Sequence, residues 1–403
     1  MNWLKQKIIK SQKHQSSAQK EINFLPFVKR CDKEVLLENG EKLIEFVSCS
    51  YLGLDQDARI INAVSNDLHD VGFSFPAART RIYSQKLDIL ETLLNEIFFN
   101  NFTVLFQNLH SCHQGVIPLL GSGEMPGYPI KPKGVTFVVD RHAHSSIQIN
   151  RSLMEQFGNV IVVDITKEND FKTVIEQISN RDTTPILFCD SIGSMGGEAD
   201  IIKLYEQIRE YDGYLYIDDA HGMSIHGTNG SGAVLKHFDN TLPVGIILTT
   251  SLAKGFGTCG GIIVVPLKSS MEFIKRFCPT YIFGGPPVIP IINASIVAAE
   301  IHLSSEIIAL QKQLWNNLEL FDELVSEDIV NYGQELPLRG KLLGNEFDAI
   351  DMGKKLRAEG IAVTVAMYPT VELHNPMIRC AFSAKHTTKQ IRQLAGNLLN
   401  SKV

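Results

Sequence analysis

Between about residues 100 and 265, short apolar runs alternate with segments that have a helical pattern. Most of these runs are continuously apolar, which is typical of strands covered on both faces by helices. The pattern predicts an α/β domain built on a mostly parallel, seven-stranded sheet. The predicted strands are 103–106, 135–140, 160–165, 185–190, 214–219, 245–250 and 260–266.

Several of these predicted strands end in a polar residue. Asp140, Asp190, Asp218 and Thr249 all stand at or near the carboxyl end of an apolar run. Ligands of open α/β sheets bind just beyond the carboxyl ends of the strands. These residues are therefore better site candidates than the same residue types inside a helix.

The C-terminal part of the chain follows a different pattern. A long helical segment is expected at 290–326, a helix at 348–359, strands at 361–366 and 378–383, and a last helix in HTTKQIRQLAGNLL (386–399). The residues at 386–388 are suited to start that helix. We predict three parts: an N-terminal segment, 1–60, that packs with a small C-terminal α+β domain, 301–403, and a large domain, 61–300.

Composition restricts the function. The net charge of -6 provides no basic field for nucleic acid. Seven scattered cysteines without a CxxC pair indicate free thiols in a reducing cytoplasm, and neither a disulfide frame nor a zinc site. No apolar run reaches the roughly 18 residues of a membrane span. Five lysines precede the first acid, Glu21, and this basic start is either a frayed or packed leading helix or a membrane-surface or lid element.

Two segments carry the candidate chemistry. In YLYIDDAHGMSIHGTNGSGAV (214–234), a buried strand ends at Asp218, and His221 and a glycine-rich turn follow. Taken alone, this is also the pattern of an acidic strand end with a nearby loop histidine. In TTSLAKGFGTCGG (249–261), Lys254 stands among small residues after a strand. Taken alone, this segment favours the interpretation of Lys254 as a solvated surface lysine.

Together the two segments match the needs of one cofactor. Pyridoxal 5'-phosphate requires a lysine for a Schiff base and an acid that keeps its pyridine nitrogen protonated. It also requires donors for its phenolic oxygen and its phosphate. Lys254, Asp218, His221 and Ser251 supply these groups in the chain order of fold-type I enzymes.

Several motifs then resemble one family. These are YLGL (51–54), VDRHAHSS (139–146), SIGSMGG (191–197), IDDAHG (217–222), HGTNGSG (226–232), SLAKGFG (251–257) and IRCAFSAKHT (378–387). In this order they resemble the α-oxoamine synthases, which join an amino acid to an acyl thioester. The resemblance covers roughly residues 45–395. It implies a fold-type I pyridoxal-phosphate transferase with a large domain and a small one.

The resemblance also implies roles at the cofactor. Lys254 would form the Schiff base and carry the proton, and Asp218 would hold the pyridinium nitrogen. His221 would bond the phenolic oxygen. His144 would stack on the ring as a second catalytic residue; its alternative is a loop histidine with satisfied hydrogen bonds. Ser194 and Ser251 would touch the cofactor through their hydroxyl groups.

The amino-acid substrate would be bound by Arg379, whose planar fork suits a carboxylate. The alternative for Arg379 is a surface arginine on a strand. Cys49 stands where the family often has an asparagine that contacts the substrate. The catalytic site has no expected metal.

The phosphate loop departs from the family pattern S-G-F-A-x-N, because this chain has NLHSCHQ (108–114). The backbone N–H groups of Leu109 and His110 could still bind phosphate at a helix start. His110 and His113 are unusual in this loop, and the sequence leaves open whether they contact cofactor or substrate. Gly284-Gly285 replaces the Ser-Thr pair through which the family's neighbouring subunit approaches the phosphate.

Within the family, HGTNGSG and TTSLAK are closest to the quorum-sensing autoinducer synthases. The resemblance therefore implies condensation of an amino acid with a fatty acyl-CoA to an α-aminoketone or α-hydroxyketone signal precursor, in a homodimer. The alternatives are an α-oxoamine synthase of primary metabolism (8-amino-7-oxononanoate, 2-amino-3-ketobutyrate or serine palmitoyltransferase type), an aminotransferase, or a non-catalytic subunit. The presence of Lys254 argues against the last.

Overall fold

The computed structural model describes residues 3–180 and 182–400, and the chain forms two compact units. We call Asp57–Ser194 with Glu198–Ala309 the large unit. Met1–Gln56, Met195–Gly197 and Leu310–Val403 form the small unit. The cofactor-binding candidates lie in the large unit, whereas Cys49 and Arg379 lie in the small unit.

The large unit contains a seven-stranded sheet in the order β4-β10-β9-β8-β7-β5-β6. Neighbouring strands are parallel except at β10, which is antiparallel to both β4 and β9. The strands are β4 (Phe102–Phe106), β5 (Val135–Asp140), β6 (Gly158–Val163), β7 (Thr184–Asp190), β8 (Tyr214–Asp218), β9 (Ile246–Ser251) and β10 (Gly261–Val265). The predicted seven-stranded, mostly parallel sheet is confirmed.

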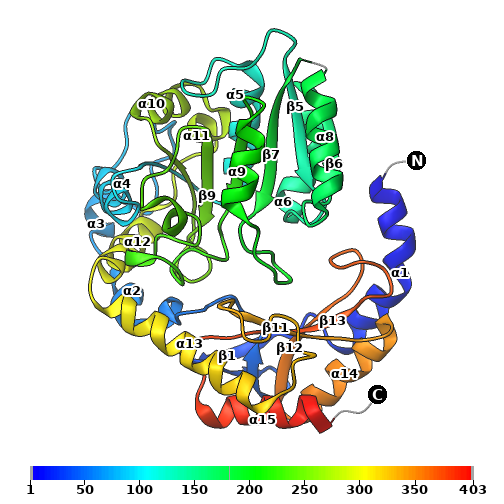
Figure 1. Cartoon of the computed structure of the whole chain (residues 1–403). Coiled ribbons are helices and arrows are strands. Elements are labelled where there is room, and N and C mark those ends of the chain that lie inside the picture. Colours follow the sequence, from blue (N-terminus) through cyan, green and yellow to red (C-terminus); the bar gives the residue numbers. More distant parts are fainter. Residues whose placement is uncertain (1–2, 181, 401–403) are drawn as a thin grey trace. The chain divides into compact units, whose positions relative to one another are not determined.

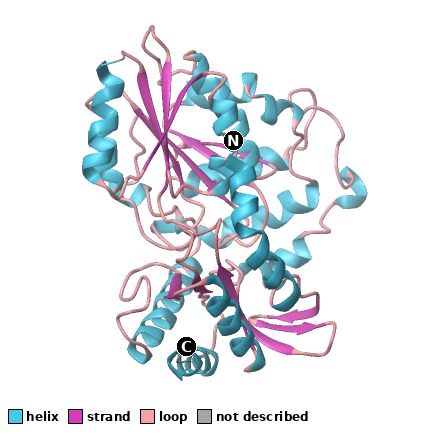
Figure 2. Ribbon diagram, turned by 90° about the vertical axis from the view of Figure 1, so that its right-hand side faces the viewer, coloured by secondary structure: helices cyan, strands magenta, loops and turns pink. Residues whose placement is uncertain are grey.

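Helices pack on both faces of this sheet (Figure 2). The central strands β5, β7, β8, β9 and β10 are buried along their whole length, which explains their continuously apolar sequences. The helices are α2 (Ala58–Ala63), α3 (Leu68–Val71), α4 (Lys86–Ile97), α5 (Leu109–Ser122), α6 (Ser145–Gln148), α7 (Arg151–Met154), α8 (Glu168–Asn180), α9 (Ile201–Arg209), α10 (Lys268–Phe277), α11 (Pro279–Phe283) and α12 (Ile289–His302), with 3-10 turns at Thr228–Gly230 and Leu235–Phe238. One predicted strand was misplaced: β6 begins and ends two residues earlier than 160–165.

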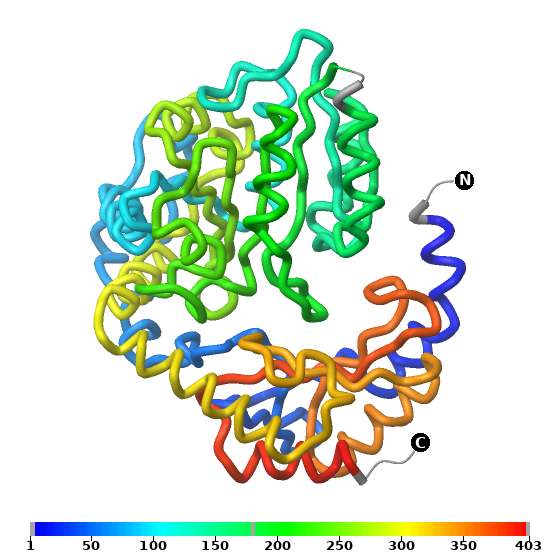
Figure 3. Tube along the Cα trace, viewed as in Figure 1, coloured from blue at the N-terminus to red at the C-terminus, as the bar shows by residue number. Residues whose placement is uncertain are grey.

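The small unit contains a six-stranded sheet in the order β1-β2-β3-β12-β13-β11. Its elements are α1 (Trp3–Glu21), β1 (Phe27–Cys31), β2 (Glu34–Leu37), β3 (Lys42–Phe46), the 3-10 turn Leu54–Gln56, β11 (Leu338–Leu342), α14 (Glu346–Ala358), β12 (Ile361–Ala366), β13 (Met377–Ala381) and α15 (Thr388–Asn400). β3 pairs in parallel with β12, so the N-terminal segment shares one sheet with the C-terminal strands. Figure 3 shows the blue N-terminal trace beside the orange and red segments.

The helical segment predicted at 290–326 is not continuous. It consists of α12, which ends at His302, and α13 (Glu306–Leu324). Between them, the Ser304 hydroxyl accepts the Glu306 N–H at 3.2 Å and so forms a turn just before the second helix. No individual helix in the described residues has the length and hydropathy to cross a membrane, and α12 with α13 is the one bent pair that does by these criteria.

The last helix starts where the sequence predicts. The Thr387 hydroxyl accepts the Gln390 N–H at 3.3 Å, and the Gln390 carboxamide accepts the Thr387 N–H at 3.0 Å. This reciprocal capping box satisfies two N–H groups that the helix itself leaves without partners. α15 therefore begins at Thr388 (Figure 1).

Candidate active site

Polar residues line up at the carboxyl edge of the large sheet. In register, Asp190 of β7 pairs with Asp218 of β8, and Asp218 pairs with Thr249 of β9. Asp140 ends the next strand, β5. All four are buried. The sheet edge expected from the sequence is thus a row of buried polar groups.

Asp190 and Asp218 differ in their ionisation. Burial, and then the charge of Asp218, raise the pKa of Asp190 well above its usual range. Burial alone would also raise the pKa of Asp218, but the contact with His113 and then the charge of Lys254 lower it. Since two adjacent buried carboxylates do not both ionise readily, the negative charge rests on Asp218.

Lys254 lies in the loop that joins β9 to β10. Backbone bonds close this loop: Leu252 N–H donates to Gly260 at 3.0 Å and Gly257 N–H donates to Lys254 at 3.1 Å. A Cβ atom at Gly255 would stand 2.9 Å from the Ser224 Cβ, so only glycine fits beside the lysine. Lys254 is half-buried rather than fully solvated, and its charge acts on Asp218, Asp190 and His144.

Ser251, the last residue of β9, is buried and accepts the Ala253 N–H at 3.1 Å. Its hydroxyl thereby starts the turn that carries Lys254. Ser194 is half-buried in the loop after β7, and His221 is buried three residues beyond Asp218. All three lie in the large unit with Lys254 and Asp218.

The start of α5 has the geometry of an anion site. Asn108 is its N-cap, and the carboxamide oxygen accepts the Ser111 N–H at 2.9 Å. The N–H groups of Leu109 and His110, in the first turn, have no acceptor within the helix. A Cβ atom at Gly261 would stand 2.4 Å from the Leu109 nitrogen, so this glycine of β10 lets the helix start approach the sheet.

His144 ends the loop after β5. Its backbone N–H donates to Asp190 at 3.1 Å, and its Nδ1 lies 2.7 Å from the Ser146 hydroxyl. The ring stays more than a third exposed, while the surrounding protein lowers its pKa. A neutral, partly exposed ring suits stacking on an aromatic ligand, although the contacts of Nδ1 also fit the alternative of a satisfied loop histidine.

His113 is one of the two residues, with His110, whose role the sequence left open. It is completely buried on α5, with Nδ1 2.9 Å from the Tyr216 hydroxyl and Nε2 3.5 Å from Asp218 Oδ2. The signal for this position is a histidine on the apolar face of a helix, four residues before the buried Ile117. His110 is half-buried at the helix start, and burial followed by the charge of His113 lowers its pKa.

The glycine-rich turn after β8 is built around Asp219. The carboxylate accepts the Ala233 N–H at 2.9 Å and the Ser191 hydroxyl. Cβ atoms at Gly222 and Gly232 would stand 2.1 and 2.0 Å from its oxygens, which explains both glycines. Burial raises the pKa of Asp219 to about 7. Asp219 is thus the anchor of the turn that carries His221.

In the small unit, Arg379 lies on β13 and is buried, so the alternative of a surface arginine is wrong. Its Nη2 lies 3.5 Å from the Cys49 sulfur. Burial alone would lower the pKa of Arg379, but Tyr51 and Cys49 raise it. The structure therefore places the two predicted substrate residues in contact.

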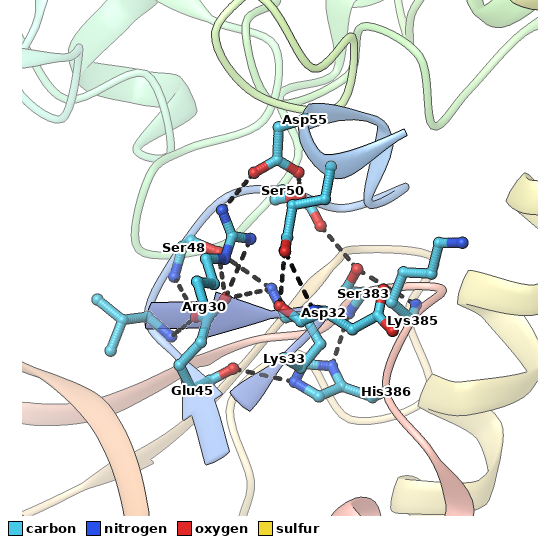
Figure 4. A network of polar contacts seen from close by, with 12 residues as sticks. Arg30, Asp32, Lys33, Glu45, Ser48, Ser50, Asp55, Ser383, Lys385 and His386 are labelled. Carbon is cyan, nitrogen blue, oxygen red and sulfur yellow. Dashed lines mark hydrogen bonds and ion pairs between the residues drawn. The ribbon is translucent and has the colours of Figure 1, made fainter. Parts of the chain in front are cut away.

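A polar network holds the loop that carries Cys49 (Figure 4). Lys33, 1% exposed, pairs with Glu45 at 2.6 Å. The Ser383 hydroxyl donates to the Ser50 carbonyl at 2.7 Å, and His386 bonds the Glu45 carbonyl at 3.0 Å through Nε2. These contacts tie residues 45–51 to the segment that follows β13, and so fix Cys49 beside Arg379.

Arg79 makes contacts that stabilise the structure of the large unit. Its guanidinium donates to the carbonyls of Leu105, at 2.7 Å, and Gly285, and lies 4.2 Å from the centre of the Tyr281 ring. Gly285 has φ = 75°, which favours glycine. The Gly284-Gly285 pair therefore forms a turn that Arg79 braces within the large unit.

The large-unit residues fit pyridoxal phosphate. Asp218 is a buried anion suited to a pyridinium nitrogen, and the start of α5 offers backbone donors to a phosphate. Lys254 is the amine close enough for its charge to act on Asp218 and His144. This set defines a fold-type I pyridoxal-phosphate enzyme.

Comparisons with known proteins agree with this class. The family model "Aminotransferase class I and II" matches residues 130–398. The chain is 29% identical to the 8-amino-7-oxononanoate synthase of Treponema denticola, over 88% of this chain and 86% of that protein. It is 27% identical to the serine palmitoyltransferase of Sphingobacterium spiritivorum, over 91% and 88% respectively. The structure of the Sphingomonas wittichii serine palmitoyltransferase matches with a TM-score of 0.85 at 17% identity, over 98% of this chain and 97% of that one.

The chain belongs to the aminotransferase class I and II family. The predicted fold class and the predicted cofactor, pyridoxal phosphate, are confirmed. Both named relatives are α-oxoamine synthases, as the sequence motifs indicated. The closeness to autoinducer synthases stays a prediction.

Proposed function

We propose that this chain is a pyridoxal-phosphate-dependent acyltransferase that condenses an amino acid with an acyl-CoA. The observation that carries the proposal is the meeting of Lys254, the ionised Asp218 and the start of α5 at one sheet edge. The likeness to two α-oxoamine synthases along nearly the whole chain supports acyl transfer over transamination.

Each residue has a defined task in this proposal. Lys254 would bind the cofactor covalently, Asp218 would hold its ring nitrogen, and the N–H groups of Leu109 and His110 would bind its phosphate. Ser194, Ser251 and His221 would donate to its other oxygens, and His144 would cover its ring. When bound, the cofactor supplies an electron sink for negative charge at the substrate Cα.

Arg379 binds the substrate carboxylate through paired hydrogen bonds, and Cys49 lies beside its guanidinium. The freed amine of Lys254 takes the Cα proton. A bond then forms between Cα and the thioester carbonyl carbon, while the C–S bond breaks and CoA leaves as its thiolate, which takes a proton from solvent. Loss of the carboxylate as CO₂, with return of a proton to Cα from Lys254, gives an α-aminoketone.

We further propose a fatty acyl-CoA as the donor and a signal precursor as the product. The support is the HGTNGSG and TTSLAK motifs. The second candidate is a primary-metabolism synthase, which the names of the relatives favour. Mass analysis of products from the purified protein, given mixed straight-chain acyl-CoAs and small amino acids, separates the two. A keto acid product without CoA release would overturn both.

We propose a homodimer in the cytoplasm. The support for a dimer is a 480 Å³ apolar pocket in the large unit, lined in part by Phe75, Ile82 and Phe283, with Phe283 82% exposed. All seven cysteines are free thiols, which persist in a reducing compartment. Sedimentation that shows an active monomer would exclude the dimer.

A further inference from the structure

His113 joins α5 to the strand that carries Asp218. It is completely buried, and its two ring nitrogens face two different residues of β8. Nδ1 lies 2.9 Å from the Tyr216 hydroxyl, and Nε2 lies 3.5 Å from Asp218 Oδ2. Tyr216 and Asp218 are two residues apart, so they share one face of the strand.

Tyr216 is held so that its hydroxyl can set the tautomer of the imidazole. Its ring stacks on Phe188, with 4.5 Å between the ring centres. Burial raises the pKa of Tyr216 well above its usual range, so the phenol keeps its proton. When the phenol donates to Nδ1, the ring hydrogen stands on Nε2 and points to Asp218.

The contact with His113 distinguishes Asp218 from its neighbour Asp190. Both carboxyl groups are buried and in register on adjacent strands. Asp190 accepts the backbone N–H of His144, at 3.1 Å. Asp218 accepts the Ala220 N–H, at 3.0 Å, and in addition faces the His113 ring. The imidazole, 3.5 Å away, is thus a polar contact of Asp218 that is longer than a hydrogen bond.

We propose that His113, backed by Tyr216, is a positioning residue that keeps the negative charge on Asp218 and thereby strengthens its bond to the pyridine nitrogen of the cofactor. The inference rests on the proposed function, because it requires pyridoxal phosphate at Asp218. It adds a residue to the site, since no role at the cofactor has been assigned to His113 above. His113 therefore acts through Asp218 and does not itself touch the ring.

The test compares two cofactors in three proteins. The wild type, His113→Phe and His113→Asn are titrated with pyridoxal phosphate and with its carbocyclic analogue, in which C–H replaces the ring nitrogen. Loss of the polar contact between the His113 ring and the charged Asp218 should weaken pyridoxal phosphate binding to His113→Phe by roughly 10- to 100-fold. Binding of the analogue should change by less than about 3-fold, and His113→Asn, which keeps a donor, should recover part of the loss.

A matched pair of tyrosine variants tests the second link. Tyr216→Phe removes the hydroxyl that faces His113, and Tyr128→Phe removes a buried hydroxyl that bonds the Ile246 carbonyl at 2.7 Å. Only Tyr216→Phe should weaken the binding of pyridoxal phosphate more than the binding of the analogue. It also keeps the inference testable if His113→Phe does not fold.

The positioning role would be overturned if the His113 and Tyr216 variants weakened the binding of both ligands equally. It would also be overturned if the variants weakened the binding of neither ligand. Failure of the wild type to bind pyridoxal phosphate would instead overturn the proposed function, and this inference with it. The two failures are therefore distinguished by the wild-type titration.

Discussion

Asp190 and Asp218 stand side by side on neighbouring strands, and their pKa values move in opposite directions. Burial and the charge of Asp218 raise the pKa of Asp190. His113 and Lys254 overcome the same burial at Asp218. Of the two buried carboxyl groups, Asp218 is thus the one on which the negative charge is favoured.

This asymmetry predicts unequal effects of two matched substitutions. Asp218→Asn removes the charge and should lower kcat by roughly 100- to 1,000-fold, because an electrostatic partner of the reacting system is lost. Asp190→Asn keeps an acceptor for the His144 N–H and replaces a carboxyl group whose pKa is raised, and it should change kcat by less than about 5-fold. Steady-state kinetics of CoA release on both variants measures the difference. Equal losses would mean that the charge is shared between the two carboxyl groups.

Lys254→Ala should abolish both turnover and the visible absorbance of the bound cofactor, because Lys254 supplies the covalent link and the proton transfer. Absorbance spectra and CoA release measure the two effects. Lys268→Ala is the matched control, since Lys268 is exposed at the start of α10 and pairs with Glu272 at 3.8 Å. Normal turnover by Lys254→Ala would contradict the mechanism.

Much of the large unit could be predicted because its signals are local. A strand such as 135–140, buried on both faces, is apolar at nearly every position, and its end is marked by Asp140. A local signal also marks α15 in the small unit, where Thr387 and Gln390 cap the helix within four residues of each other. The break between α12 and α13 was missed because serine and leucine in 303–305 are also compatible with a helix.

Contacts between distant segments could not be predicted in the same way. His113 and Tyr216 are 103 positions apart, and only the packing of α5 on the sheet brings them together. The sequence marked His113 as unusual without indicating its partner. Arg79 is a second case, because the carbonyl of Gly285 that it binds carries no side-chain signal.

Arg379→Ala should raise the KM for the amino acid by roughly 10- to 100-fold, because a charge-assisted pair of hydrogen bonds to the carboxylate is lost. The KM for the acyl-CoA should change by less than about 3-fold, since that substrate presents no carboxylate at this residue. Arg379→Lys, which keeps the charge without the fork, should fall between. Cys49→Asn, measured in the same assay, tests the second predicted substrate residue. Equal changes of both KM values would remove Arg379 from this role.

Acid should destabilise the small unit through His386. Burial, assisted by the charge of Lys33, lowers the pKa of His386 to about 3 from an ordinary 6.5. The unfolded chain therefore binds a proton below pH ~6.5 that the folded chain does not, so stability falls as the pH decreases. The slope is ~1.4 kcal/mol per pH unit for this one group.

His386→Gln should lower the free energy of unfolding at pH 7, because the stacking of the ring on Phe46, with 4.0 Å between ring centres, is lost. The substitution should also reduce the decline in the free energy of unfolding between pH 6.5 and pH 5, because glutamine does not titrate. His69→Gln, at an exposed position, should do neither. Urea unfolding of the wild type, His386→Gln and His69→Gln at pH 7, 6 and 5 gives the change in the free energy of unfolding with pH for each protein. An unchanged slope in His386→Gln would show that His386 does not cause the acid sensitivity.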